Sequence, residues 1–73
     1  MPTVQIDGKL LSIGDYVCFK SDIEQCGKIV AMKPSAWGTG KELVLENNNG
    51  FDGDYIGGQT RTTVMASECW VEG

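Results

Sequence analysis

The sequence predicts an all-β protein, built as a small barrel of about five antiparallel strands. Three features predict this class. Short runs rich in β-branched and aromatic residues recur along the chain, ten glycines supply frequent turns, and little of the sequence favours a helix. With 73 residues, the chain is expected to form one domain, residues 1–73.

The first expected element is a hairpin of residues 2–11 that turns at Asp7-Gly8. An Asp-Gly pair between alternating residues is a strong signal for a two-residue hairpin turn. Because successive side chains of a strand point to opposite faces, Val4 and Ile6 are expected to share the buried face.

A second pair of strands follows. A turn at Gly14-Asp15 opens a strand at residues 16–20, in which Val17 and Phe19 fall on one face. Residues 21–25 are predicted to form a polar connector of hairpin length.

The return strand begins near Gly27, which predicts either a bulge or a close approach of another segment to the backbone. The run 29–32 is continuously apolar, so alternation alone does not assign its buried face. We expect both Ile29 and Met32 to face the core, and this spacing requires a β-bulge between them.

The remaining strands are expected at residues 41–46 and 61–65, followed by a single 3-10 turn at residues 66–69 and a closing strand at 70–72. The expected core consists of the inward-facing apolar residues of all these strands: Val4, Ile6, Val17, Phe19, Ile29, Met32, Leu43, Leu45, Val64 and Val71, with Trp70 partly buried.

Two loops are candidates for function. Trp37 stands in the Pro- and Gly-containing loop of residues 33–40, where it is either a binding anchor or a cover folded back over the barrel edge. Residues 47–60 form the longest irregular stretch, and a long loop in a small domain is often functional. We expect Phe51, Tyr55 and Ile56 to pin this loop to the barrel.

No catalytic, metal or cofactor site is expected. The chain has no His, the commonest general base, and no Cys-x-x-Cys spacing for zinc. Residues 47–54 are rich in oxygen donors, but their spacing differs from that of the helix-flanked calcium loop. Three cysteines without a secretory signal favour free thiols in a reducing compartment, with a Cys18–Cys26 disulfide as the alternative for an exported chain.

Three short motifs occur in a familiar order: Gly-Asp-Tyr-Val-Cys-Phe at residues 14–19, Gly-Lys-Ile at 27–29, and a short turn before a last strand within 64–71. In this order they resemble SH3-like barrels of the KOW and Tudor kind, over most of residues 13–72. The resemblance implies the barrel fold. It does not imply one function, because such barrels include peptide binders, RNA contacts, readers of methylated ligands and structural subunits.

We expect a small non-catalytic protein-interaction or structural module located in the cytoplasm, with no membrane contact. Its partner is expected to be another protein or a second copy of the chain, bound through free sheet edges. The candidate binding residues are aromatic: Tyr16, Trp37, Phe51, Tyr55 and Trp70. The alternative is a nucleic-acid-binding SH3-like domain with a local basic face beside Tyr16, made by Lys20, Lys28, Lys33 and Arg61. The net charge of −4 disfavours this alternative.

Overall fold

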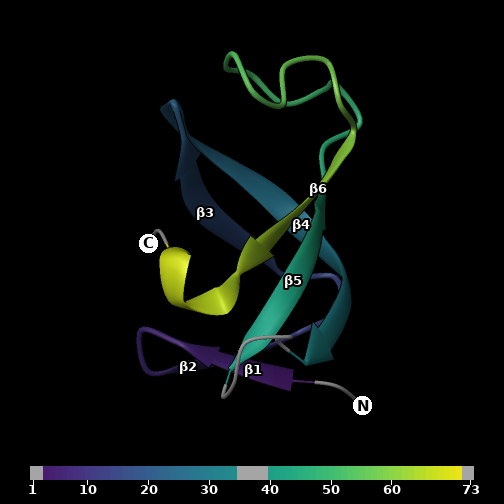
Figure 1. The fold of residues 1–73 in the computed structure, drawn as a ribbon. Helices are drawn as coiled ribbons and strands as arrows, with labels where there is room; N and C mark the ends of the chain where they lie inside the picture. The colour runs from purple at the N-terminus through teal and green to yellow at the C-terminus, as the bar shows by residue number, and fades with distance from the viewer. Residues whose placement is uncertain (1–2, 35–39, 72–73) are drawn as a thin grey trace.

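The computed structural model describes residues 3–34 and 40–71, and in them the protein is all-β, as predicted. A hairpin of two strands lies beside a four-stranded antiparallel sheet (Figure 1). The hairpin consists of β1 (Thr3–Ile6) and β2 (Lys9–Ser12). The sheet is formed in chain order by β3 (Tyr16–Ser21), β4 (Ile23–Pro34), β5 (Lys41–Glu46) and β6 (Arg61–Met65), and the 3-10 turn η1 (Ala66–Glu68) follows.

The predicted N-terminal hairpin is confirmed. Ile6 pairs with Lys9, so only Asp7 and Gly8 form the turn, with φ angles of 53° and 78°. Two consecutive left-handed residues make a type I′ turn, which matches the twist of antiparallel strands. Val4 and Ile6 are buried on the shared face, as expected.

The polar connector predicted for residues 21–25 is wrong. The pairing of β3 with β4 continues to Ser21 and Ile23 and leaves Asp22 alone at the turn, with φ of 66°. Polar residues can pair as strands here because the hairpin satisfies their backbone groups while their side chains project from the sheet.

The predicted bulge in β4 is confirmed. Ile29 pairs with Leu45 and Ala31 pairs with Val44, so Val30 is the extra residue on the bulged strand. Ile29 is fully buried and Met32 packs against the core. Without the bulge, a spacing of three residues would place these two side chains on opposite faces of the sheet.

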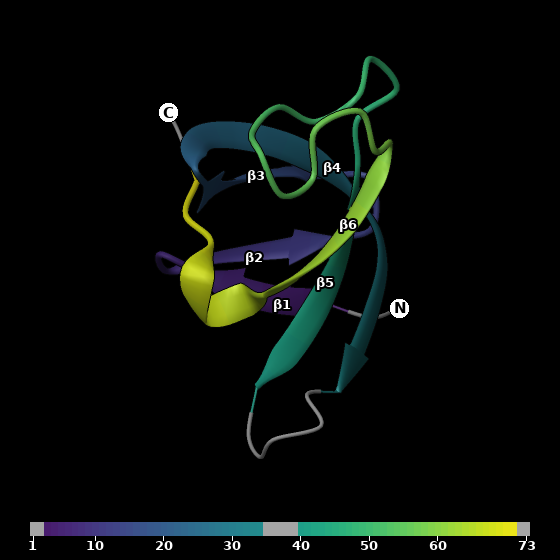
Figure 2. The same ribbon diagram turned by 45° about the horizontal axis from the view of Figure 1, so that its top comes forward.

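The end of the chain returns to β3 (Figure 2). After η1, the backbone N–H and C=O of Trp70 exchange hydrogen bonds of 2.9 and 2.8 Å with Cys18. The predicted 3-10 turn is present as η1. The predicted closing strand is reduced to one antiparallel bridge, between Trp70 and Cys18. Within residues 3–34 and 40–71 the sheet remains four-stranded, without the continuous ladder of a closed barrel.

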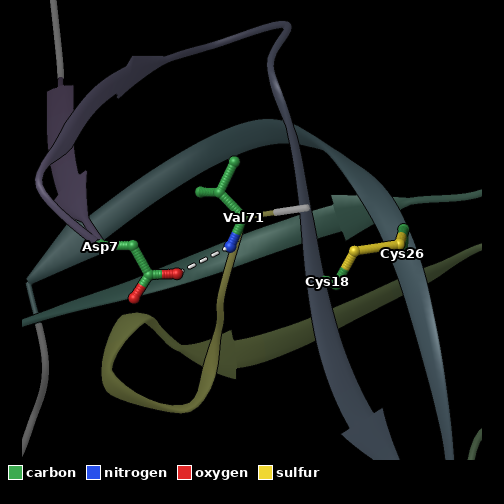
Figure 3. Close-up of a disulfide and its surroundings, with 4 residues drawn as sticks. All are labelled: Asp7, Cys18, Cys26 and Val71. Carbon is green, nitrogen blue, oxygen red and sulfur yellow. Dashed lines mark hydrogen bonds between the residues drawn. A yellow bond between two sulfur atoms is a disulfide. The ribbon is translucent and has the colours of Figure 1, made fainter. Parts of the chain in front are cut away.

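Side-chain hydrogen bonds attach both ends of the N-terminal hairpin to distant parts of the chain. The N–H of Val71 donates a hydrogen bond of 3.0 Å to Oδ2 of Asp7, which reaches from the hairpin turn to the C-terminal segment (Figure 3). At the other end of the hairpin, Nζ of Lys41 donates to the carbonyl oxygen of Thr3. The hairpin is thus tied to both β5 and the end of the chain.

The core largely matches the predicted one. Seven of the ten predicted residues are buried, while Met32, Val64 and Val71 are partly buried against the cluster and Trp70 is half-buried. The buried residues that the strand pattern did not supply are Leu11, Cys18, Phe51 and Cys69. Cys18, Phe51 and Cys69 lie outside the expected inward positions of the strands, and their burial depends on how distant segments pack.

Candidate functional site

A hollow of about 370 Å³ opens on the outer surface of the sheet, where β3 and β4 meet the start of the loop after β5. We call it the Tyr16 hollow. Its lining residues come from three segments of the chain: Tyr16, Cys26, Gly27, Lys28, Glu46, Asn47, Asn48 and Asn49.

One row of cross-strand neighbours runs along the hollow. Tyr16 pairs with Lys28, Lys28 with Glu46, and Glu46 with Arg61. Directly opposed residues project from the same face of a sheet, so these four side chains are neighbours in that order. We call them the outer row. Its first member offers an aromatic ring to solvent, because Tyr16 is 65% exposed.

The charges of the outer row are unequally matched. Nε of Arg61 lies 3.1 Å from Oε2 of Glu46, which forms a hydrogen-bonded ion pair. Among the ion pairs of the described residues, none includes Lys28. The row therefore carries one cation, the half-buried Lys28, whose charge no direct contact balances.

The asparagines form the opposite wall. Oδ1 of Asn47 accepts a hydrogen bond of 3.0 Å from the N–H of Asn49, and the backbone of Asn47 bonds to Thr60 and Gly50. These bonds hold a tight turn at the rim. They occupy the side-chain oxygen of Asn47, which leaves its Nδ2 group as the donor side of the amide.

A disulfide joins Cys18 to Cys26 beside the hollow (Figure 3). The expectation of free thiols is wrong at these two positions, and the disulfide that the sequence left as the alternative is present. The register explains the pairing. Cys18 lies directly opposite Cys26 with a Cα–Cα distance of 3.9 Å, and its own N–H and C=O point away from β4 to Trp70. Such non-hydrogen-bonded pairs bring side chains closest together.

The third cysteine is part of the core. Cys69 is a buried free thiol, and its Sγ lies 3.5 Å from the carbonyl oxygen of Met65. Burial, and secondly the charge of Glu68, raise the pKa of this thiol to about 11. Cys69 therefore carries almost no thiolate at neutral pH, and a thiolate is the form that reacts.

The structure separates the predicted binding aromatics. Tyr16 lines the hollow, whereas Tyr55 is 80% exposed on the 47–60 loop and lies outside the lining. Trp70 is half-buried and bridges to Cys18. Trp37 lies outside the described residues. The described aromatics thus do not surround one common cage at the hollow.

Phe51 needs a correction as a binding residue. Its side chain is 2% exposed, and its ring packs edge-on against Phe19 with a centroid distance of 5.6 Å. A ring held in the core offers no surface to a partner. Its role is the anchoring role that the sequence also predicted. Ile56 packs against the same core cluster, while Tyr55 takes no part.

The 47–60 loop is docked on the tip of the β3–β4 hairpin, at the end of the molecule opposite β1 and β2 (Figure 1). The side-chain amide of Gln25 makes two hydrogen bonds of 2.9 Å with the backbone of Asp52, one in each direction. The N–H of Asp54 donates to Oδ2 of Asp22 at 2.5 Å. These contacts hold the loop that supplies the asparagine wall.

The predicted basic side chains do lie on one face, but each has an acidic neighbour. Lys20 pairs across strands with Glu24, and Lys33 lies 3.9 Å from Glu42. With Arg61 on Glu46, two of the four cations form ion pairs, while Lys20 and Lys28 each lie opposite a Glu in the strand register. The face is therefore mixed in sign, whereas a phosphate-binding surface is typically a continuous basic patch.

Residues 3–34 and 40–71 contain no cluster of three or more His, Cys, Asp or Glu side chains that could hold a metal ion. In the same residues no helix has the length and apolar character needed to span a membrane.

Comparison of the chain with protein-family models, curated proteins and solved structures finds no match. The case for a function therefore rests on the geometry of the chain itself. The sequence pattern predicts Tyr16 as a binding residue and places Lys28 beside it on one face. The sequence also marks the 47–60 loop as a candidate for function, but it does not place residues 47–49 beside Tyr16, because only the strand register brings them together.

Proposed function

We propose that the protein is a small non-catalytic interaction module with an SH3-like arrangement, and that it binds a partner protein at the Tyr16 hollow. The order of the elements supports the arrangement: a four-stranded meander, a 3-10 turn and a return of the chain to the first strand of the sheet. The single observation that carries the proposed function is the exposed Tyr16 ring at the rim of a hollow with a fixed wall.

Exposed aromatic rings beside polar groups are frequent anchors of protein interfaces, because a Tyr offers large contact area and a polar tip. The wall opposite Tyr16 is held by backbone and side-chain hydrogen bonds, so little conformational freedom is lost when a partner binds. Nucleic acid is a weaker candidate, since the acidic net charge and the interleaved Glu residues oppose a polyanion.

Self-association through a sheet edge is the second candidate. In the described part of the chain the strand order ends at β6, whose outer edge pairs with no further strand. An unpaired edge can add a strand of another chain. This candidate makes a different demand from the first, because it requires no contribution from Tyr16.

The experiment compares immobilised wild-type protein with Tyr16→Ala in capture from a lysate of the source organism, with and without nuclease. Tyr55→Ala is the matched control, since Tyr55 is also exposed but lies outside the hollow. The proposal expects a nuclease-resistant protein that Tyr16→Ala loses and Tyr55→Ala retains. Capture unaffected by Tyr16→Ala would overturn it, and sedimentation of the isolated chain as a dimer would favour the β6 edge.

A further inference from the structure

We propose that the Tyr16 hollow recognises a carboxylate of a peptide segment, with Lys28 as the charge partner and the Tyr16 ring as the packing surface. This inference rests on the proposed use of the hollow and names the chemistry that would bind there. It starts from the one charge of the outer row that has no direct partner, Lys28, at a wall of the hollow.

The charge balance of the row favours an anion. Glu46 is held by Arg61 at 3.1 Å, so its negative charge is already matched within the protein. Lys28, Glu46 and Arg61 together carry a net charge of +1, and the unmatched positive charge is that of Lys28. Lys28 lies between Tyr16 and Glu46 in the row and lines the hollow, so an anion that enters the hollow meets a positively charged side chain.

Hydrogen-bond capacity points the same way. One acceptor oxygen of Glu46 and the side-chain oxygen of Asn47 are used within the protein. The ammonium of Lys28 and the Nδ2 group of Asn47 are donors, so a ligand that supplies acceptor oxygens complements them. A carboxylate supplies two such oxygens in one plane.

The size of the charge discriminates between carboxylate and phosphate. A phosphate monoester carries about −1.5 to −2 charges at pH 7, whereas a carboxylate carries one. One unmatched cation balances one negative charge. The net charge of −4 on the whole chain adds a further penalty for a dianion. A peptide carboxylate is therefore the better match.

The ring of Tyr16 specifies what accompanies the carboxylate. It is 65% exposed and lies next to Lys28 in the adjacent strand. An apolar or aromatic side chain near the carboxylate can cover this ring, while its charged group reaches Lys28. The source of the carboxylate is either a chain terminus or an Asp or Glu side chain, and the probes below separate the two.

The test is a titration of ¹⁵N-labelled protein followed by amide chemical shifts. The probe is N-acetyl-L-phenylalanine, which has a terminal carboxylate, and N-acetyl-L-phenylalaninamide is its uncharged match. N-acetyl-L-glutamate N-methylamide presents a side-chain carboxylate, and phenyl phosphate presents a dianion. We expect saturable shifts at Tyr16, Lys28 and Asn49 with a dissociation constant on the order of 1 mM for one of the carboxylate probes.

Two variants decide whether Lys28 is responsible. Lys28→Gln is expected to weaken binding of the carboxylate probe about tenfold and to leave the response to the amide probe unchanged. Lys20→Gln is the matched control, because Lys20 lies on the same face but outside the hollow and opposite Glu24. It should bind as wild type does. Dispersed amide spectra of both variants establish that they are folded.

Three results would overturn the inference: equal affinity for the amide probe, equal loss with Lys20→Gln, or tighter binding of phenyl phosphate than of either carboxylate. The outcome is separable from that of the proposed function. If lysate capture depends on Tyr16 but no carboxylate probe binds, the hollow docks its partner by other chemistry and only this inference fails.

Discussion

The ring of Phe51 occupies the space that a side chain at Gly27 would need. A Cβ atom built on Gly27 would lie 3.2 Å from both Cε1 and Cζ of Phe51, and 3.0 Å from Cβ of Leu45. Phe51 belongs to the loop after β5, and Gly27 lies in β4. The absence of a side chain at Gly27 therefore lets the loop bury its anchor in the core, beside Phe19.

Gly27→Ala is expected to destabilise the protein by about 1–3 kcal/mol, the usual cost of forcing an extra methyl group into a packed core. Urea unfolding measures the change. In a Phe51→Leu background the branched, smaller side chain relieves the crowding, so the cost of Gly27→Ala should fall. An equal cost in both backgrounds would show that the Phe51 ring is not what limits space at this position.

Gln25→Ala is expected to loosen the 47–60 loop while the sheet persists. The variant removes two hydrogen bonds to the backbone of Asp52, each worth about 1 kcal/mol. Hydrogen exchange of the Asp52 amide should accelerate roughly tenfold or more. Glu24→Ala is the control, because the neighbouring side chain projects from the opposite face of β4. Unchanged exchange at Asp52 in Gln25→Ala would show that the Gln25 amide does not hold the backbone of Asp52.

Asp7 has two separable roles, a left-handed turn residue and an acceptor for the N–H of Val71. Asp7→Ala loses both and is expected to cost about 1–3 kcal/mol. Asp7→Gly preserves the turn and loses the acceptor, while Asp7→Asn preserves both. Amide exchange at Val71 should therefore rise in the Ala and Gly variants but not in Asn. Protection that survives in Asp7→Gly would show that another group satisfies Val71.

Reduction of the Cys18–Cys26 disulfide is expected to lower the free energy of unfolding by about 2–3 kcal/mol, the chain-entropy value for so short a loop. The comparison is urea unfolding with and without a reductant. Cys69→Ala, which retains the disulfide, should show the same loss on reduction. Thiol labelling of the unfolded, unreduced protein should find one free cysteine, and three would contradict the disulfide.

The raised pKa of Cys69 gives stability a defined pH dependence. The unfolded thiol loses its proton near the ordinary value of 9.0, whereas the folded thiol holds its proton up to about 11. The contribution of Cys69 to stability is therefore fully present below pH 9 and is lost as the pH rises through 11.

Alkylation of the folded protein by iodoacetamide measures the same effect. Its rate should rise with an apparent pKa near 11, and should rise at lower pH once the chain is unfolded. Glu68→Gln removes the second cause of the shift and should bring the pKa somewhat nearer to its ordinary value. A folded-state rate that levels off near pH 9 would show that the thiol is accessible to water.

Several elements could be predicted because their signals are local. The Asp7-Gly8 turn depends on the backbone preferences of two adjacent residues, and the bulge in β4 follows from two apolar residues three positions apart. The 21–25 connector was mispredicted for the complementary reason. Polar composition suggested a loop, but Gln25 lies in β4. Its polar side chain binds the backbone of Asp52, which lies 27 residues away in the chain.

The sequence by itself determined the all-β class, the N-terminal hairpin and most of the core, since alternation along a strand and turn chemistry act over a few residues. Only the tertiary structure decided that Cys18 faces Cys26, that Phe51 is buried against Gly27, and that Asn47 forms a wall opposite Tyr16. Each of these depends on strand register or on the docking of a long loop. Such contacts arise from the packing of the whole chain, and no short stretch of residues encodes them.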